Sequence, residues 1–266
     1  MPDMLSICAD LRAEHDDLDA LVAHMDEPTW DTQTPAEGWS IRDTISHLNY
    51  FDERATLAAV EPEEFIDWRN TSATEELTRT DGDPADVAFG RSTDLNTLLQ
   101  QWRADRAQML TAFEVLEAKA RIPWFGPDMS AASFATARLM ETWAHGQDVA
   151  DALDTQRAPT DRLKHICHIG VRALPFAYTI RKVEIPTEPI YVDVSSPSGE
   201  KWTWGPEEAE NKVTGTALDL ALVVTQRRHR DDTDLKAIGP VADQWLSIAQ
   251  AFAGPVGPGR KPGQFR

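Results

Sequence analysis

The chain has 266 residues, of which 41% are hydrophobic and 26% are charged, and it contains nine tryptophans. This composition is typical of a compact globular protein and excludes a disordered chain, and the length indicates two domains of modest size. Acidic residues outnumber basic ones by 44 to 26, and a net charge of −18 disfavours binding to nucleic acid or to anionic lipid.

Charged residues begin close to the N-terminus, and no apolar run reaches the ~18 residues that a membrane span requires. The two cysteines, Cys8 and Cys167, lie in helical patterns and not in paired motifs, which fits a reducing compartment. We therefore expect a cytoplasmic protein whose partner is a small molecule, with no nucleic-acid or membrane partner.

Apolar residues recur at helical spacing over residues 4–25 and predict a first amphipathic helix. Ser40 is a natural N-cap for a second helix over residues 41–60, because Asp43 follows it at the spacing of a capping box. Residues 65–91 are polar and irregular, and we expect a loop there with one short helix over residues 74–79.

A third long helix is predicted over residues 94–120, and the segment IPWFGPDMS then interrupts the helical pattern. A fourth helix is predicted over residues 130–153. Four long helices with a polar crossover between the second and the third indicate a four-helix bundle, a fold in which facing side chains often build metal sites.

The pattern changes after residue 157. A helix is predicted over residues 160–174, and a β-hairpin follows, with an SPSG turn between alternating residues. A short helix over residues 218–226, a strand over 235–238 and a last helix over 241–252 complete a small α+β unit. The overall expectation is an α+β protein that is mainly α: a bundle over residues 1–157, an α+β domain over 158–254 and a flexible tail over 255–266.

The segment METWAHGQDVADAL carries the most informative chemistry. Glu141 and His145 are four residues apart and Asp148 is three further on, so all three project from one face of the fourth helix. Together with His47 on the second helix, Glu141 and His145 make a set of two imidazoles and one carboxylate, which leaves coordination positions open on a divalent metal. On spacing alone, Glu141 and His145 also fit an ordinary ion pair on a helix.

These two segments, GWSIRDTISHL and ETWAHGQDVADAL, together resemble the DinB-like superfamily and, within it, the mycothiol-dependent maleylpyruvate isomerases of Actinobacteria. The resemblance implies a DinB-like bundle with a metal held by His47, Glu141 and His145. It also implies that Asp148 orients a ligand histidine and that Arg227 faces the active site. The family pattern ends in Gly-Arg, whereas Gln226 precedes Arg227 in this chain.

The resulting hypothesis is a metal- and thiol-dependent isomerase or S-transferase acting on a small anionic electrophile. Ligand type favours zinc, with nickel or another divalent ion as alternatives, and the resemblance implies mycothiol as the thiol. Asp148 and either Arg227 or Arg228 would be catalytic, the arginine by holding a substrate carboxylate. Self-association into a homodimer is left open.

Two other functions compete with this hypothesis. Metal-bound water in place of the thiol would make a hydrolase. A fourth protein ligand, for instance His15 or Asp148, would seal the metal and leave a noncatalytic binding module. The pair His165 and His168 is a weaker candidate for a second metal site, and Trp39 and Trp143 are expected to pack in the core.

Overall fold

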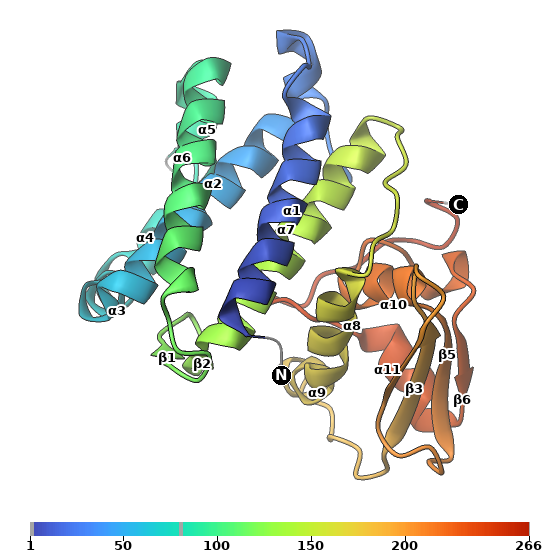
Figure 1. Ribbon diagram of the computed structural model, residues 1–266. Helices are drawn as coiled ribbons and strands as arrows, with labels where there is room; N and C mark the ends of the chain where they lie inside the picture. Colours follow the sequence, from blue (N-terminus) through green and yellow to red (C-terminus); the bar gives the residue numbers. More distant parts are fainter. Residues whose placement is uncertain (1–2, 80–81, 266) are drawn as a thin grey trace. The chain divides into compact units, whose positions relative to one another are not determined.

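The computed structural model describes residues 3–79 and 82–265, which form two compact units divided between Arg157 and Ala158. The first unit is built of helices with a two-stranded ribbon, and the second combines helices with a four-stranded sheet (Figure 1). The predicted α+β, mainly α fold is confirmed. No helix within the described ranges has both the length and the apolar composition needed to cross a membrane.

Four long helices dominate the first unit: α1 (Met4–Val22), α2 (Ile41–Val60), α6 (Leu95–Glu114) and α7 (Ala131–Ala152). Helix α1 packs along α7 and helix α2 packs along α6, with further contacts of α1 to α6 and of α2 to α7 (Figure 1). The four predicted helices are confirmed, although the third ends at Glu114 and not near residue 120.

Apolar side chains from all four long helices meet in one buried cluster, which the side chain of Trp30 joins from the turn η1 (Glu27–Asp31). Burial of this surface is the main term that holds such helices together, at roughly 25 cal/mol per Å² of apolar area. The cluster consists of Leu18, Val22, Trp30, Ile41, Ile45, Leu48, Leu98, Leu99, Trp102 and Val149.

The segment between α2 and α6 is more helical than its sequence indicates. It contains α3 (Pro62–Thr71), α4 (Ala73–Thr78) and α5 (Ala85–Ser92). The short helix predicted over residues 74–79 is present as α4, but the expectation of loop elsewhere is wrong for α3 and α5. Helix α5 packs on α2 so closely that a Cβ atom at Gly90 would lie 2.6 Å from the Cβ of Ser46.

The IPWFGPDMS segment breaks the helical pattern as predicted, and it does so by forming a small ribbon. Strands β1 (Arg121–Ile122) and β2 (Met129–Ser130) pair antiparallel, and the intervening turn carries Trp124 and Phe125. Ser130 then caps α7, because its Oγ accepts a hydrogen bond from the amide of Ser133.

The second unit has a sheet in the order β4-β3-β5-β6. Strands β3 and β4 form the predicted hairpin, whereas β5 was not predicted and pairs parallel with β3. Strand β6 closes the other edge antiparallel to β5. The elements in chain order are α8 (Leu163–Arg172), α9 (Leu174–Ile180), β3 (Ile190–Ser195), β4 (Lys201–Trp204), β5 (Asn211–Thr216), α10 (Ala217–Val224), η2 (Arg230–Asp232), β6 (Lys236–Ile238) and α11 (Pro240–Ile248).

Residues 255–265 have no helix or strand, yet part of this tail contacts the rest of the second unit. The amide of Gly263 donates a hydrogen bond to Asp232 at 2.7 Å, and the ring of Phe265 lies under the guanidinium of Arg228. The flexibility expected of the tail stays a prediction.

Candidate metal centre

His47 lies on the second turn of α2, at a height fixed by the cap of that helix. Ser40 and Asp43 form the predicted capping box: the amide of Ser40 donates to Oδ2 of Asp43, and the amide of Asp43 donates to Oγ of Ser40. Asp43 also accepts a hydrogen bond from Arg91, which follows directly after Gly90 on α5. The start of α2, and with it the position of His47, is therefore set by both helices.

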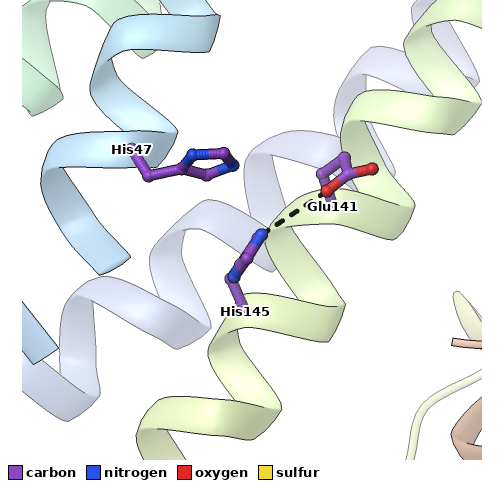
Figure 2. Close-up of side chains that lie close together, drawn as sticks. All are labelled: His47, Glu141 and His145. Atoms are coloured by element: carbon purple, nitrogen blue, oxygen red, sulfur yellow. Dashed lines mark ion pairs between the residues drawn. The ribbon is translucent and has the colours of Figure 1, made fainter. Parts of the chain in front are cut away.

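Glu141 and His145 project from successive turns of α7 toward His47 (Figure 2). Nε2 of His145 lies 3.5 Å from Oε2 of Glu141. One donor atom from each of the three residues lies within 4.8 Å of the others. This donor set fits a divalent metal with nitrogen and oxygen ligands, zinc in particular. No other group of this kind is found among residues 3–79 and 82–265.

Asp86 is a residue that the sequence interpretation missed. Its Oδ2 lies 2.8 Å from Nδ1 of His47, so this carboxylate fixes the ring and leaves Nε2 to face Glu141 and His145. A carboxylate behind a histidine ligand both selects the tautomer and increases the basicity of the coordinating nitrogen. The sequence Pro84-Ala85-Asp86 marks the start of α5 and could have drawn attention to Asp86. It was missed because most of residues 65–91 was predicted to be loop.

Asp148 lies on the opposite side of His145 from Glu141. Its Oδ2 is 3.6 Å from Nδ1 of His145, which is too long for a hydrogen bond, and the side chain of Asp148 is fully buried. Nδ1 of His145 has no hydrogen-bond partner in the structure. The geometry thus puts Asp148 near His145 without the direct bond that Asp86 makes to His47.

Burial and neighbouring charges set the protonation of the site. Burial lowers the pKa of His47 to about 4 despite the opposing effect of Asp86, so the ring is neutral near pH 7. Burial also acts to raise the pKa of Glu141, but contact with His145 and its charge outweigh that effect and lower the pKa to about 2. A neutral imidazole and an ionised carboxylate are the forms that bind metal.

Aromatic rings enclose one side of the imidazoles. The ring of Trp39 lies 4.7 Å from that of His47 and stacks on His145 at 5.8 Å, measured between centroids. The ring of Phe51, one turn after His47, lies 4.7 Å from it on α2. Trp39 therefore packs, as expected, but it packs against the two imidazoles. Trp143 is buried on α7 with the guanidinium of Arg157 5.8 Å from its ring.

A buried ion pair joins the two helices that carry the triad. Nη2 of Arg138 on α7 lies 2.7 Å from Oδ1 of Asp52 on α2, and both side chains are almost completely buried. Arg138 also helps to lower the pKa of Glu141, one turn away. The pair consequently connects α2 with α7 and also favours the ionised form of Glu141.

His15 lies inside the bundle on α1 and does not belong to the triad. It is 1% exposed, and neither of its ring nitrogens has a hydrogen-bond partner. Burial, reinforced by the charges of Arg106, Arg138 and Arg12, lowers its pKa well below the usual value. Its predicted alternative role, closing the metal as a fourth ligand, has no support in this geometry.

Arg227 and Arg228 lie in the second unit, directly after α10. Nη1 of Arg227 donates to the carbonyl of Thr225 at 2.7 Å, and Nη1 of Arg228 donates to the carbonyl of Arg227 at 2.7 Å. Gln226 has φ of 58°, the left-handed conformation that favours glycine. This position, where the resembling family has glycine, thus keeps a glycine-like backbone. The catalytic role of Arg227 stays a prediction.

His165 and His168 lie on α8, also in the second unit. Nδ1 of His168 accepts a hydrogen bond from Nε1 of Trp204 at 3.1 Å. Since neither histidine falls in a three-residue donor group within the described ranges, a second metal site is not supported here.

Comparison with known proteins agrees with this geometry. The family model described as the mycothiol maleylpyruvate isomerase N-terminal domain matches residues 11–150, which include the triad. A second family model, described as wyosine base formation, matches residues 186–237.

Two curated relatives from Mycobacterium tuberculosis strains CDC 1551 and H37Rv, both described as uncharacterized proteins, are each 44% identical over 265 residues. These alignments cover 98% of this chain and all of each relative. The match therefore extends through both units.

Among solved structures, the crystal structure of the mycothiol-dependent maleylpyruvate isomerase is similar, with a TM-score of 0.56 at 16% identity. An alanine variant of that enzyme gives 0.57 at 15% identity. Each comparison covers 89% of this chain and 93% of the other. At this identity the likeness concerns the fold.

Proposed function

The chain belongs to the mycothiol maleylpyruvate isomerase family of DinB-like proteins, and from that premise we propose that it is a metal- and thiol-dependent isomerase or S-transferase acting on a small electrophile. The observation that carries the proposal is the convergence of His47, Glu141 and His145 from two helices on one point. Family membership and geometry support the same three residues.

His47, Glu141 and His145 would hold the divalent ion, with zinc favoured by the ligand types. When bound, such an ion lowers the pKa of a coordinated thiol, so that the nucleophilic thiolate is available near neutral pH. Mycothiol is the thiol that family membership favours.

The chain's own residues would prepare this site in two ways. Asp86 holds Nδ1 of His47 and presents Nε2 to the ion. The rings of Trp39 and Phe51 cover the imidazoles and reduce the access of water. Lower water content strengthens the electrostatic interactions of the site. Asp148 would orient His145, and Arg227 would hold a substrate carboxylate.

A set of three protein ligands would leave one coordination position of the metal open. This favours a catalytic site over a noncatalytic module in which a fourth protein ligand closes the metal. The nearest further candidates do not complete the sphere: Asp148 lies on the Nδ1 side of His145, and His15 is outside the donor group.

Metal content and thiol dependence test the proposal. Purified protein is expected to hold about one equivalent of divalent metal, and the His47→Ala variant to lose most of it, as measured by plasma mass spectrometry. His24→Ala is the matched control, because His24 is an exposed histidine outside the donor group. Equal metal content in the two variants would contradict the triad.

Turnover of a model electrophile should then require both the metal and an added low-molecular-weight thiol. Activity in a thiol-free buffer would contradict the thiol-dependent mechanism and favour the hydrolase.

A further inference from the structure

A row of aromatic side chains begins at the triad and continues away from it over the first unit. Its members come from α2, from α3 and from the turn between β1 and β2, and each ring contacts the next. We name this set the aromatic row; it consists of Phe51, Phe65, Trp68, Trp124 and Phe125.

Phe51 connects the row to the metal centre. Its ring lies 4.7 Å from that of His47, and it also contacts the rings of Trp124 at 6.2 Å and Phe125 at 6.0 Å, measured between centroids. Trp124 stacks on Phe65 at 5.2 Å with an angle of 6° between the ring planes. The aromatic surface is therefore continuous from the ligand histidine to the tip of the ribbon.

Polar contacts on the outer side hold this arrangement. Nη1 of Arg69 on α3 donates to the carbonyl of Trp124 at 2.5 Å, which ties the turn to the helix. The guanidinium of Arg54 lies 4.6 Å from the ring of Trp68, and Nε1 of Trp68 donates to Glu76. The rings are thus fixed before any ligand arrives, which reduces the entropy lost on binding.

Exposure separates the members of the row that serve packing from those that remain accessible. Phe65 is fully buried and forms the floor. Phe51 and Trp124 are only partly buried, and Phe125 is 38% exposed. Core packing accounts for Phe65, but it does not require accessible rings in line with a ligand histidine. Accessible apolar surface next to a candidate metal site is typical of a ligand pocket wall.

We propose that the aromatic row is the substrate-side wall of the metal centre and that it selects electrophiles with a planar, apolar body. This inference rests on the proposed function, since the metal supplies the polar end of the site. A ligand would place its polar group at the triad and its aromatic or unsaturated body against Phe51, Trp124 and Phe125. Offset stacking and edge-to-face contacts of this kind add affinity beyond the area that they bury.

Two hydroxamate probes that share a metal-binding group test the proposal. Acetohydroxamate reaches the metal alone, whereas benzohydroxamate adds a phenyl ring that can reach the aromatic row. We expect zinc-loaded full-length protein to bind benzohydroxamate about tenfold more tightly in isothermal titration calorimetry, as one or two good ring contacts provide. The metal content is measured after each titration to exclude extraction of the ion.

The Phe51→Ala and Phe125→Ala variants should both lose most of this preference. Phe125→Ala should bind acetohydroxamate as the unmodified protein does, because the ring of Phe125 reaches His47 only through Phe51. The control is Ile66→Ala, which removes an apolar side chain of similar exposure, 37%, from α3 outside the aromatic row. It should leave both affinities unchanged.

The outcomes separate this proposal from the metal centre itself. Equal affinity for the two probes would show that the aromatic row does not bind the phenyl ring, which would overturn this inference. The proposed metal centre would be unaffected by that result. A preference that survives both phenylalanine substitutions would also overturn the inference. If neither probe bound, and the protein retained no metal after loading with zinc, the proposed function itself would be overturned.

Discussion

Two histidines, His47 and His15, lie inside the same helical bundle but differ in their hydrogen bonds. His47 has a carboxylate, Asp86, on one ring nitrogen and faces the triad with the other. His15 is buried more deeply, and neither of its nitrogens has a hydrogen-bond partner. A polar contact with Asp86 therefore fixes the orientation of the His47 ring, whereas the His15 ring is held by packing without a hydrogen bond.

The surroundings of the two residues differ in the same way. Near His47, two carboxylates have partners on a neighbouring helix: Asp86 contacts His47, and Asp43 accepts a hydrogen bond from Arg91. The charge of Arg138 acts on His15, and Nε of Arg138 and Oδ2 of its ion-pair partner Asp52 have no hydrogen-bond partner. Such groups are commonly satisfied by ordered internal water. We therefore expect the proposed metal binding to depend on the partners of His47, and the folding stability to depend on the groups near His15.

The largest expected effect on stability comes from disrupting the ion pair between Asp52 and Arg138. The Arg138→Met substitution leaves a buried carboxylate without its partner, and we expect the free energy of unfolding to fall by about 3–5 kcal/mol. Urea unfolding followed by circular dichroism measures the change.

The double variant Asp52→Leu with Arg138→Met removes both charges and should regain much of this loss. Equal destabilisation in the single and the double variant would show that packing, and not the unpaired charge, determines the effect.

Replacing Asp86, the partner of His47, tests whether the proposed metal binding depends on the orientation of that histidine. The Asp86→Asn substitution keeps the size of the side chain but removes its charge, and we expect metal affinity to fall by about 10- to 100-fold. Competition with a chromogenic chelator measures the affinity. The control is Asp67→Asn, because Asp67 is an exposed carboxylate on α3 outside the donor group. If the two variants bound metal equally well, Asp86 would have no orienting role.

The lowered pKa of His15 predicts a dependence of stability on pH. Below pH ~6.5 the unfolded chain protonates this histidine while the folded chain does not, so the folded state loses stability as the pH falls. As long as His15 stays neutral in the folded chain, each pH unit below this value removes up to about 1.4 kcal/mol. The His15→Leu variant should lack this part of the dependence, as measured by urea unfolding at several pH values. Parallel pH curves for the two proteins would contradict the assignment.

Local signals made the framework of the site predictable from sequence. Ser40, Asp43 and Pro62 set both ends of α2, and the observed helix agrees with the predicted range. Glu141 and His145 were predictable because their spacing is fixed by a single helix. Bringing His47 to them required the resemblance to a family, since no local rule states which helix faces which.

Long-range packing accounts for most of what was missed. Helix α5 is eight residues long and has no side-chain cap, so packing against α2 stabilises it. Its Asp86 could not be placed beside His47 from sequence alone. Strand β5 escaped detection for a similar reason, because it is held by parallel pairing with β3, which is distant in the chain.

The close approach of α5 to α2 links position 90 to the candidate metal centre. The amide of Gly90 donates to Oγ of Ser46, and the helices meet where glycine has only a hydrogen atom. A lineage that acquired a larger side chain there would have to move α5 outward, and the carboxylate of Asp86 would move with it. A change at this one small residue would therefore reach the candidate metal centre, although Gly90 is not part of it.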